Sequence, residues 1–290
     1  MFFVNFLKSL VVPRYMSKYR AMSVFIAFGI FFVSSLILAI PQMTNISKNR
    51  YKLVDDQNAY YLNIFKELND ENINVLNETS FKLEYGHLTY GEDIEKGSIQ
   101  YYDFVLEKDF IRIGFDTYDI LDPEAKPNVL IFDSFNEIEK PVNGNKYLIV
   151  FYNESAIYYS PTFQKELKYQ ENNVFDFSKI EDGSEISYHL MDLYIPDINI
   201  QVSFNTFIAC VIFPLLISLV LWLFLRSGGN TLSFKETYNI ASISSIVPFI
   251  IIFALSWIFP HYEFVSYYSV LFGIYFLIMM LIINSKKKIA

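Results

Sequence analysis

Four long stretches without a charged residue dominate the pattern of hydrophobic and polar positions along the chain. They cover residues 21–40, 204–225, 238–259 and 264–283, and none contains Asp, Glu, Lys, Arg or His. A helix needs about 20 apolar residues to cross a hydrocarbon layer of roughly 30 Å. One buried helix of a soluble protein can be equally apolar, but four such runs predict four membrane-spanning helices.

Positively charged residues cluster at those ends of the runs that would face the same side of a membrane. They are Lys8, Arg14, Lys18 and Arg20 before the first run, Arg226 and Lys235 after the second, and Lys286, Lys287 and Lys288 after the fourth. Lys and Arg in short loops remain cytoplasmic. We therefore expect both termini inside and residues 42–203 outside, where 14 Lys or Arg stand against 29 Asp or Glu.

This topology predicts an order of segments along the chain. They are a cytoplasmic amphipathic segment (1–20), a first span (21–41), an extracytoplasmic domain (42–203), a second span (204–225), a cytoplasmic connector (226–237), a third span (238–259), an outer turn (260–263), a fourth span (264–284) and a basic cytoplasmic tail (285–290). The first run could instead be the apolar region of a cleaved signal peptide. Its length and the lack of a small-x-small site at 38–41 favour an uncleaved anchor.

The first twelve residues have an amphipathic pattern of their own. Phe3, Phe6, Leu7 and Leu10 fall on one helical face, and Pro13 ends the run. This pattern predicts a helix lying in the inner membrane interface, and a disordered tail is the alternative.

The segment between the first two spans begins with a helical pattern and then changes period. Asp55 and Asp56 are good N-caps for a helix with apolar residues at 61, 64, 65 and 68. Alternating apolar and polar residues at 81–85 and 111–115 predict half-buried strands. Short apolar runs at 129–132 and 147–152 predict two more, and the second run begins a hairpin that continues through 156–159.

A second helix is expected from Ser184 to just before Pro196, because proline restricts the residue that precedes it. Turn signals at 122–123, 126–127 and 143–145 separate the strands. The fold class predicted for the whole chain is a membrane protein with four transmembrane α-helices, one N-terminal and three C-terminal. An α+β, mostly antiparallel extracytoplasmic domain is inserted between the first two spans.

Composition narrows the functional classes. Of 290 residues, 53% are hydrophobic and the net charge is -8, which argues against nucleic acid as a partner. A single cysteine, Cys210, excludes an intramolecular disulfide framework and CxxC-based metal or redox motifs. It lies in an apolar span, which predicts an inert thiol.

No catalytic, cofactor or metal site can be assigned from the sequence. It has no nucleophile elbow, SxxK, HExxH or GxGxxG motif, so a membrane enzyme is only a secondary reading. Acidic clusters at 92–95 and 181–185 could bind Ca²⁺, but a solvated acidic surface is the simpler interpretation. His87 and His189 each lack a second ligand nearby, and Tyr101, Tyr102, Tyr158 and Tyr159 fit either strand packing or saccharide stacking.

A conduction pathway would require ionisable side chains inside the spans. The four apolar runs contain no Asp, Glu, Lys, Arg or His. Ser242, Ser244, Ser245 and Pro248 in the third span indicate close helix packing. We therefore expect the helices to have a structural role.

The start of the chain resembles a known family. Residues 3–20 read FVNFLKSLVVPRYMSKYR, and the first span ends in Ile40-Pro41-Gln42. With the connector LSFKETYNIA at 232–241, which is also similar to Yip-type membrane proteins, this order of parts resembles the bacterial membrane proteins grouped as domain of unknown function 1189. Some members carry the label maltodextrin utilisation protein MalA. The resemblance implies a fold and an association with sugar uptake, but no catalytic residues.

Two functional hypotheses follow from these observations. The first is a non-enzymatic protein of a bacterial cytoplasmic membrane, whose outer domain senses or binds a partner, such as a sugar-uptake transporter beside it in the lipid bilayer. The second is an accessory subunit or chaperone of a membrane transporter that acts through its transmembrane helices. No cofactor is expected in either case.

Overall fold

The computed structural model describes residues 2–55, 62–118, 135–139, 144–161, 163–227, 232–260 and 262–287. The chain forms two compact units. Residues 1–48 and 197–290 make a helical unit, and residues 49–196 make a sheet unit. The sheet unit is therefore inserted into the sequence of the helical unit, and the two helices that cross the boundaries contribute residues to both.

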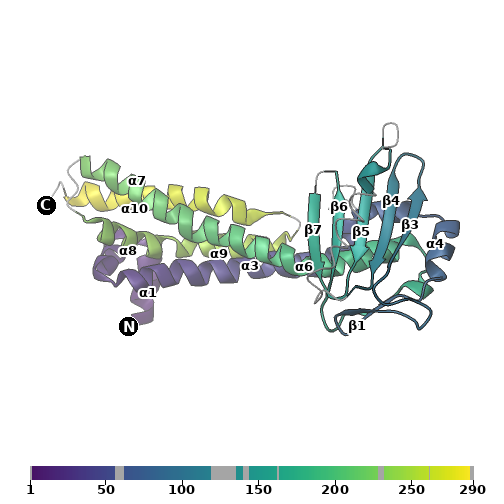
Figure 1. Ribbon diagram of the computed structural model, residues 1–290. Coiled ribbons are helices and arrows are strands. Elements are labelled where there is room, and N and C mark those ends of the chain that lie inside the picture. The colour runs from purple at the N-terminus through teal and green to yellow at the C-terminus, as the bar shows by residue number, and fades with distance from the viewer. Residues whose placement is uncertain are drawn as a thin grey trace. The chain divides into compact units, whose positions relative to one another are not determined.

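The helical unit contains the long helices of the chain (Figure 1). Its elements are α1 (Phe2–Val11), α2 (Pro13–Met16), η1 (Ser17–Ala21), α3 (Val24–Asp55), α6 (Gly183–Phe207), the π-helical turn η4 (Ile208–Ile212), α7 (Phe213–Ser227), α8 (Phe234–Ser244), α9 (Ile246–Ile258), η5 (Phe264–Tyr267) and α10 (Tyr268–Lys287). Four helical segments are long and apolar enough to cross a membrane: Val24–Asp55, Gly183–Ser227, Phe234–Ile258 and Phe264–Ser285. The four predicted helices are thus present.

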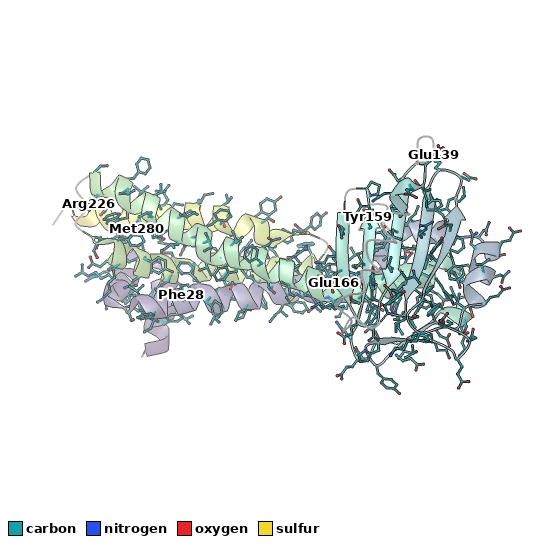
Figure 2. The ribbon with its side chains drawn as sticks, in the orientation of Figure 1. Phe28, Glu139, Tyr159, Glu166, Arg226 and Met280 are labelled. Carbon is teal, nitrogen blue, oxygen red and sulfur yellow. The ribbon has the colours of Figure 1, made fainter. Side chains whose placement is uncertain are left out.

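Helix α3 is apolar on both of its faces. Ala27, Phe31 and Leu38 are fully buried at helical spacing, so they form the face that packs in the helical unit. On another face Phe25 is 87% exposed, and Phe28 projects from the helix (Figure 2). A helix that is hydrophobic all round is typical of a membrane span.

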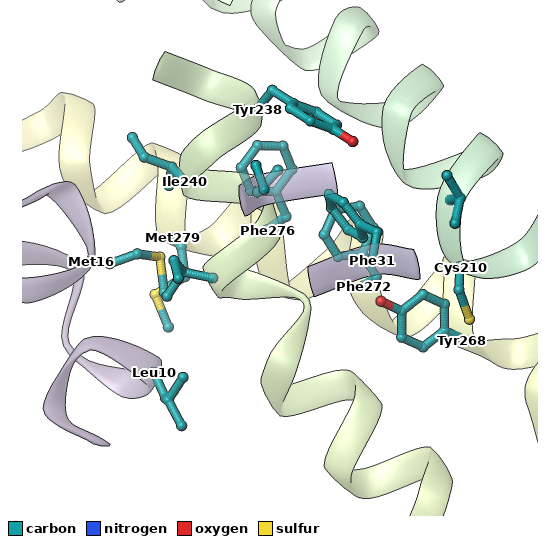
Figure 3. Packing of buried hydrophobic residues seen from close by; sticks show 14 of the residues in the cluster. Leu10, Met16, Phe31, Cys210, Tyr238, Ile240, Tyr268, Phe272, Phe276 and Met279 are labelled. Carbon is teal, nitrogen blue, oxygen red and sulfur yellow. The ribbon is translucent and has the colours of Figure 1, made fainter. Parts of the chain in front are cut away.

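Aromatic rings from three helices form the centre of the helical unit (Figure 3). The Phe31 ring on α3 lies 5.4 Å from Tyr238 on α8 and 6.0 Å from Phe272 on α10, measured between ring centroids. Phe276 continues this stack along α10 at 5.5 Å from Phe272. These contacts join the first span to the last two.

The predicted N-terminal helix is present as α1, and it also packs against the rest of the helical unit. Ser9 and Leu10 are buried, and the hydroxyl of Tyr275 on α10 donates to the Leu10 carbonyl oxygen. Leu7 is 46% exposed, and the side chain of Phe3 lies outside the described residues. The amphipathic face is therefore divided between a packed end and an exposed end.

The third predicted span begins earlier than its apolar run. Ser233 and Glu236 form a capping box, in which the Ser233 side chain accepts from the Glu236 amide and the Glu236 side chain accepts from the Ser233 amide. This cap starts α8 at Phe234, because two otherwise unpaired amides gain acceptors there. A break at Ser245 then separates α8 from α9.

The sheet unit contains two sheets (Figure 1). Its elements are η2 (Leu62–Glu67), α4 (Asp70–Asn77), β1 (Lys82–Glu84), β2 (His87–Thr89), β3 (Ile99–Val105), β4 (Phe110–Asp116), β5 (Lys146–Phe151), β6 (Ser155–Ser160), β7 (Phe163–Lys168), β8 (Phe175–Asp176) and η3 (Phe177–Lys179). The strand orders are β2-β1-β8 and β3-β4-β5-β6-β7. Among these pairs β4 and β5 are parallel and the others antiparallel, so the predicted, mostly antiparallel sheet is present.

Both faces of the larger sheet are covered. On one face Phe115 stacks on Phe81 at 4.1 Å and lies 4.8 Å from Phe177. On the other face Phe110, Phe135, Leu148, Val150 and Tyr152 form a second cluster. The predicted half-buried strand at 111–115 is therefore buried on both sides.

Arg112 shows how this double burial is tolerated. It is only 4% exposed, and its guanidinium donates to both carboxylate oxygens of Asp103 on β3 at 2.6 and 2.7 Å. The same guanidinium lies 4.3 Å from the ring centroid of Tyr101. A two-point ion pair of this kind supplies the partner that a buried charge needs.

Two helix boundaries differ from the predictions. Asp55 is the last residue of α3, residues 62–67 form a 3-10 helix rather than an α-helix, and Asp56 lies outside the described residues. Helix α6 runs through Pro196 to Phe207. Tyr194 and Ile198 on either side of the proline are buried, so packing outweighs the one missing hydrogen bond. The strand predicted at 129–132 lies outside the described residues.

Candidate functional site

The residues that the sequence singled out do not come together in one place. Cys210 is a free, buried thiol in the helical unit. His87 is exposed on β2, whereas His189 is 8% exposed and stacks on Phe175 at 4.4 Å. His261 lies outside the described residues.

Acidic side chains of both clusters accept hydrogen bonds from residues of the same region of the chain. Asp93 accepts a hydrogen bond from the Ser80 hydroxyl at 3.1 Å, and Glu185 accepts from the Glu181 amide at 3.1 Å. Asp182 accepts from the Ser184 amide at 2.6 Å, at the start of α6. Within the part of the chain that the structure describes, no group of three or more His, Cys, Asp or Glu side chains could hold a metal ion.

The four tyrosines considered for saccharide stacking also have separate surroundings. The Tyr101 ring lies beneath the Arg112 guanidinium, and the Tyr102 hydroxyl donates to the Gln100 side chain at 3.2 Å. Tyr158 is fully buried, and Tyr159 packs edge-on against Phe135. Packing therefore accounts for the rings of Tyr158 and Tyr159, whereas Tyr101 is 52% exposed.

Serine hydroxyls in the third span bond within their own helices. Ser242 donates to the Asn239 carbonyl at 2.9 Å, Ser244 to Ile240 at 2.9 Å, and Ser245 to Ser242 at 2.7 Å. All three serines are fully buried. They fill the narrow contact between helices, as close packing requires.

One large cavity lies in the helical unit and is apolar. It has a volume of about 740 Å³ and runs between the η4 and α7 segment and α10, with Gly273 and Ile217 among its lining residues. No charged side chain lines it in the described part of the chain. It offers room for a hydrocarbon group.

A second cavity, in the sheet unit, is small and polar. It has a volume of about 200 Å³ and lies beside Asp116, with its remaining walls formed by Leu88, Tyr90, Lys96, Thr117, Tyr118 and Asn153. We call it the Asp116 cavity. A single water molecule needs far less room, and the pockets of drug-sized ligands are larger, so the cavity suits a small polar molecule.

Sheet topology places this cavity at the carboxyl ends of the parallel strands. Phe115 on β4 pairs with Phe151 on β5, so the next residues, Asp116 and Tyr152, lie side by side on one face. Ligands of open α/β sheets bind at this end of parallel strands, because the chain turns away there and leaves a crevice.

Hydrogen bonds hold the walls in position. The Leu88 amide donates to the Asn153 carbonyl at 2.8 Å and so links β2 to the β5–β6 turn. The Thr117 hydroxyl accepts from the Ser98 amide at 2.9 Å and lies 3.1 Å from the Glu95 carbonyl. These contacts fix the turn that carries Lys96.

Asp116 is the buried charge of the site. It is 1% exposed, and its Oδ1 accepts from the Tyr118 amide at 2.9 Å. Its Oδ2 has no hydrogen-bond partner among the described residues. Burial raises the pKa of this carboxyl to about 6, because the charged form loses its water, and the Tyr118 amide offsets only part of that effect.

Two phenols extend this group of buried polar atoms. The hydroxyl of Tyr152 also has no hydrogen-bond partner within the described residues. Burial raises the pKa of Tyr152, and the Asp116 charge raises it further. Burial likewise raises the pKa of Tyr169, with a contribution from Tyr152. A buried polar group without a partner is destabilising, so Oδ2 of Asp116 and the hydroxyl of Tyr152 are the atoms here that a bound molecule could satisfy.

The side chains that line the cavity determine the chemistry open to it. A carboxyl with a raised pKa can act as a general acid or base. Among the described residues that line the cavity, the hydroxyl of Thr117 is engaged by the backbone. The unpartnered Oδ2 of Asp116 gives the cavity a hydrogen-bond acceptor for a ligand.

The sequence did not point to Asp116. The available signal was a carboxylate that directly follows the alternating run at 111–115, where a strand ends. The sequence around Asp116 does not reveal that β4 pairs in parallel with β5, which lies some thirty residues further along the chain.

Comparison with known proteins gives no further guidance. No protein-family model matches the chain, no curated protein matches it, and no solved structure matches it. The four apolar helices and the Asp116 cavity are thus the features on which an interpretation of function rests.

Proposed function

We propose that this chain is a multi-pass protein of a bacterial cytoplasmic membrane that binds a small polar ligand with a sheet unit located outside the cell membrane. The observation that carries the proposal is the Asp116 cavity, where a buried carboxylate lacks a partner for one oxygen. The helical unit serves as the anchor, since four of its segments are long and apolar enough to span a bilayer.

The charge distribution supports the proposed orientation. Residues 42–203 have 14 Lys or Arg and 29 Asp or Glu, whereas the short flanks of the apolar runs are basic. Basic flanks stay on the cytoplasmic side. Arg226 lies near the end of α7, on the proposed inner side (Figure 2).

Cysteine labelling in intact cells tests the orientation. The native thiol is first removed by Cys210→Ala, and single cysteines are then placed by Val105→Cys, Val174→Cys or Ser227→Cys at exposed positions. An impermeant maleimide should label the first two and not the third. Labelling at position 227 with positions 105 and 174 silent would refute the proposed topology.

The apolar cavity of the helical unit favours a second candidate function. An accessory subunit of a membrane transporter would contact its partner through such a surface. The resemblance to domain of unknown function 1189 leads us to propose a sugar-uptake transporter as that partner.

Deletion of residues 46–196 separates the two candidates. A subunit that acts through its helices should still co-purify with the transporter after the deletion. A protein that works through the Asp116 cavity should lose ligand binding, because the deletion removes that cavity. Full-length protein carrying Asp116→Asn is the companion sample, since it changes only the cavity.

A further inference from the structure

The N-terminal part of the helical unit carries positive charges that no acidic side chain balances. Residues 1–54 contain no Asp or Glu. Lys8, Arg14 and Lys18 are exposed, and among the described residues none of the three forms an ion pair with a carboxylate. Arg20, by contrast, lies 3.8 Å from Glu236. The charges of the first three residues are therefore available to an anion from outside the chain.

A tyrosine ring brings two of these charges together. The ammonium groups of Lys8 and Lys18 lie 5.8 and 5.0 Å from the ring centroid of Tyr15. The face of an aromatic ring attracts a cation, but two ammonium groups beside one ring also repel each other. A bound anion would remove that repulsion. We call this group of Lys8, Tyr15 and Lys18 the Tyr15 corner.

Packing holds the Tyr15 corner in place. Val12 has an extended backbone (φ -103°, ψ 110°) and Pro13 follows it, so the chain turns between α1 and α2. On either side of this turn Leu10 and Met16 are buried in the core of the helical unit (Figure 3). The Leu10 carbonyl oxygen accepts from the hydroxyl of Tyr275. The two lysines thus project from a fixed turn of the chain, which lowers the entropic cost of binding an anion between them.

Exposed apolar side chains adjoin the positive charges. Val4 and Val11 recur with Lys8 at helical spacing, so the three share one face of α1, and both valines are exposed. A soluble anion would make no use of these valines. A helix that combines exposed apolar residues with lysines suits the interface of a membrane, where the apolar side chains enter the acyl region and the lysine stems reach the headgroups.

We infer that the Tyr15 corner binds the headgroup of an anionic phospholipid, with its phosphate at the ammonium groups of Lys8 and Lys18 and its acyl chains beside Val4 and Val11. A lipid with a net negative charge is required, because the trimethylammonium group of phosphatidylcholine would be repelled by the two lysines. The inference goes beyond the proposed function, since it concerns the helical unit and uses no residue of the Asp116 cavity.

Native mass spectrometry of the full-length protein in a neutral detergent tests the inference. The probes are dioleoylphosphatidylglycerol and dioleoylphosphatidylcholine, with inorganic phosphate as a competitor. The first phosphatidylglycerol should bind at least about tenfold more tightly than phosphatidylcholine, because only the former has a net charge that the lysines complement. Inorganic phosphate at the concentration of the lipid should not displace it, because the free ion lacks acyl chains.

Variants locate the binding. Lys8→Gln together with Lys18→Gln should weaken phosphatidylglycerol binding at least about tenfold. The matched control, Arg226→Gln together with Lys235→Gln, loses the same charge on the proposed inner side and should change binding less than about twofold. Tyr15→Leu should weaken binding at least about threefold, whereas Tyr15→Phe, which keeps the ring, should retain it.

Four outcomes would overturn the inference. They are equal binding of the two lipids, binding unaffected by the Lys8 and Lys18 double variant or by Tyr15→Leu, equal weakening by the control double variant, and displacement by inorganic phosphate. Equal weakening would show a diffuse effect of charge, and displacement would make the ligand a soluble anion. Asp116→Asn should leave lipid binding unchanged, so failure of the proposed function at the cavity is distinguishable from failure of this inference.

Discussion

Two buried titratable groups in the sheet unit should respond to acid in opposite directions. His189 is 8% exposed, and burial lowers its pKa to about 4. Its Nε2 has no hydrogen-bond partner among the described residues. Asp116 is 1% exposed, and burial raises its pKa to about 6. Each group is therefore held neutral more strongly in the folded state than in the unfolded chain.

The signs follow from proton linkage. Below about pH 6.5 the unfolded chain binds a proton at His189 that the folded protein refuses until about pH 4, so stability falls across that window. At Asp116 the folded protein binds its proton first, near pH 6, so stability rises as the pH falls from about 6 to about 4. Each shift exceeds two pH units, and each effect is on the order of 3 kcal/mol.

The two effects should nearly cancel in the unaltered sheet unit. We expect a soluble fragment of residues 46–196 to fold alone, because residues 49–196 form a compact unit with its own aromatic core. Acidification from about pH 7 to about pH 4.5 should change its stability little. On the same acidification the His189→Phe fragment should become more stable than it is at neutral pH, and the Asp116→Asn fragment should become less stable.

Urea unfolding followed by far-ultraviolet circular dichroism measures these changes. Fluorescence is not suitable, because both tryptophans, Trp222 and Trp257, lie outside the fragment. Since the variants share every other titratable group, their difference isolates the two sites. Equal pH dependence in all three fragments would refute the reasoning that burial controls these two pKa values.

Three further predictions concern packing. Phe115→Ala should destabilise the sheet unit by about 3–5 kcal/mol in urea unfolding, because its ring fills the aromatic core, while the 79% exposed Val105→Ala should change stability by less than about 0.5 kcal/mol. Gly183→Ala should lower the melting temperature of the same fragment despite better helix propensity, since a Cβ there would lie 1.8 Å from the Phe65 carbonyl oxygen; an unchanged melt would contradict the contact. Ser245→Leu should lower the detergent stability of the full-length protein by about 1–3 kcal/mol, since this serine is fully buried; Ile251→Leu, at a 42% exposed position, is the control for a fluorescence-detected melt.

The helices were predictable because their signal is local and long. A run of about 20 apolar residues predicts a long apolar helix from local sequence alone, and the ends are then refined by caps such as Ser233 with Glu236. The hairpin of β5 and β6 was predictable for the same reason, since its two strands adjoin in sequence.

Features that depend on distant pairing were not predictable. Nothing near Pro196 reveals that buried neighbours carry α6 through it. Likewise Arg112 reads as a solvent-facing residue in an alternating strand, although a second layer of side chains covers it. The Asp116 cavity combines both difficulties, because its walls come from β2, the 95–98 turn and the ends of two strands that meet only in the folded sheet.

The insertion of the sheet unit into the helical unit has a consequence for biosynthesis. The Asn239 side chain donates to the carbonyl oxygens of Arg20 and Met22, and Tyr275 donates to that of Leu10, across more than 200 residues of chain. Ribosomes elongate by about 5–20 residues per second, so the N-terminal helices wait on the order of 10–40 seconds for these partners. During that interval the packing face of α3 has only transient neighbours, which makes assembly sensitive to the pace of translation.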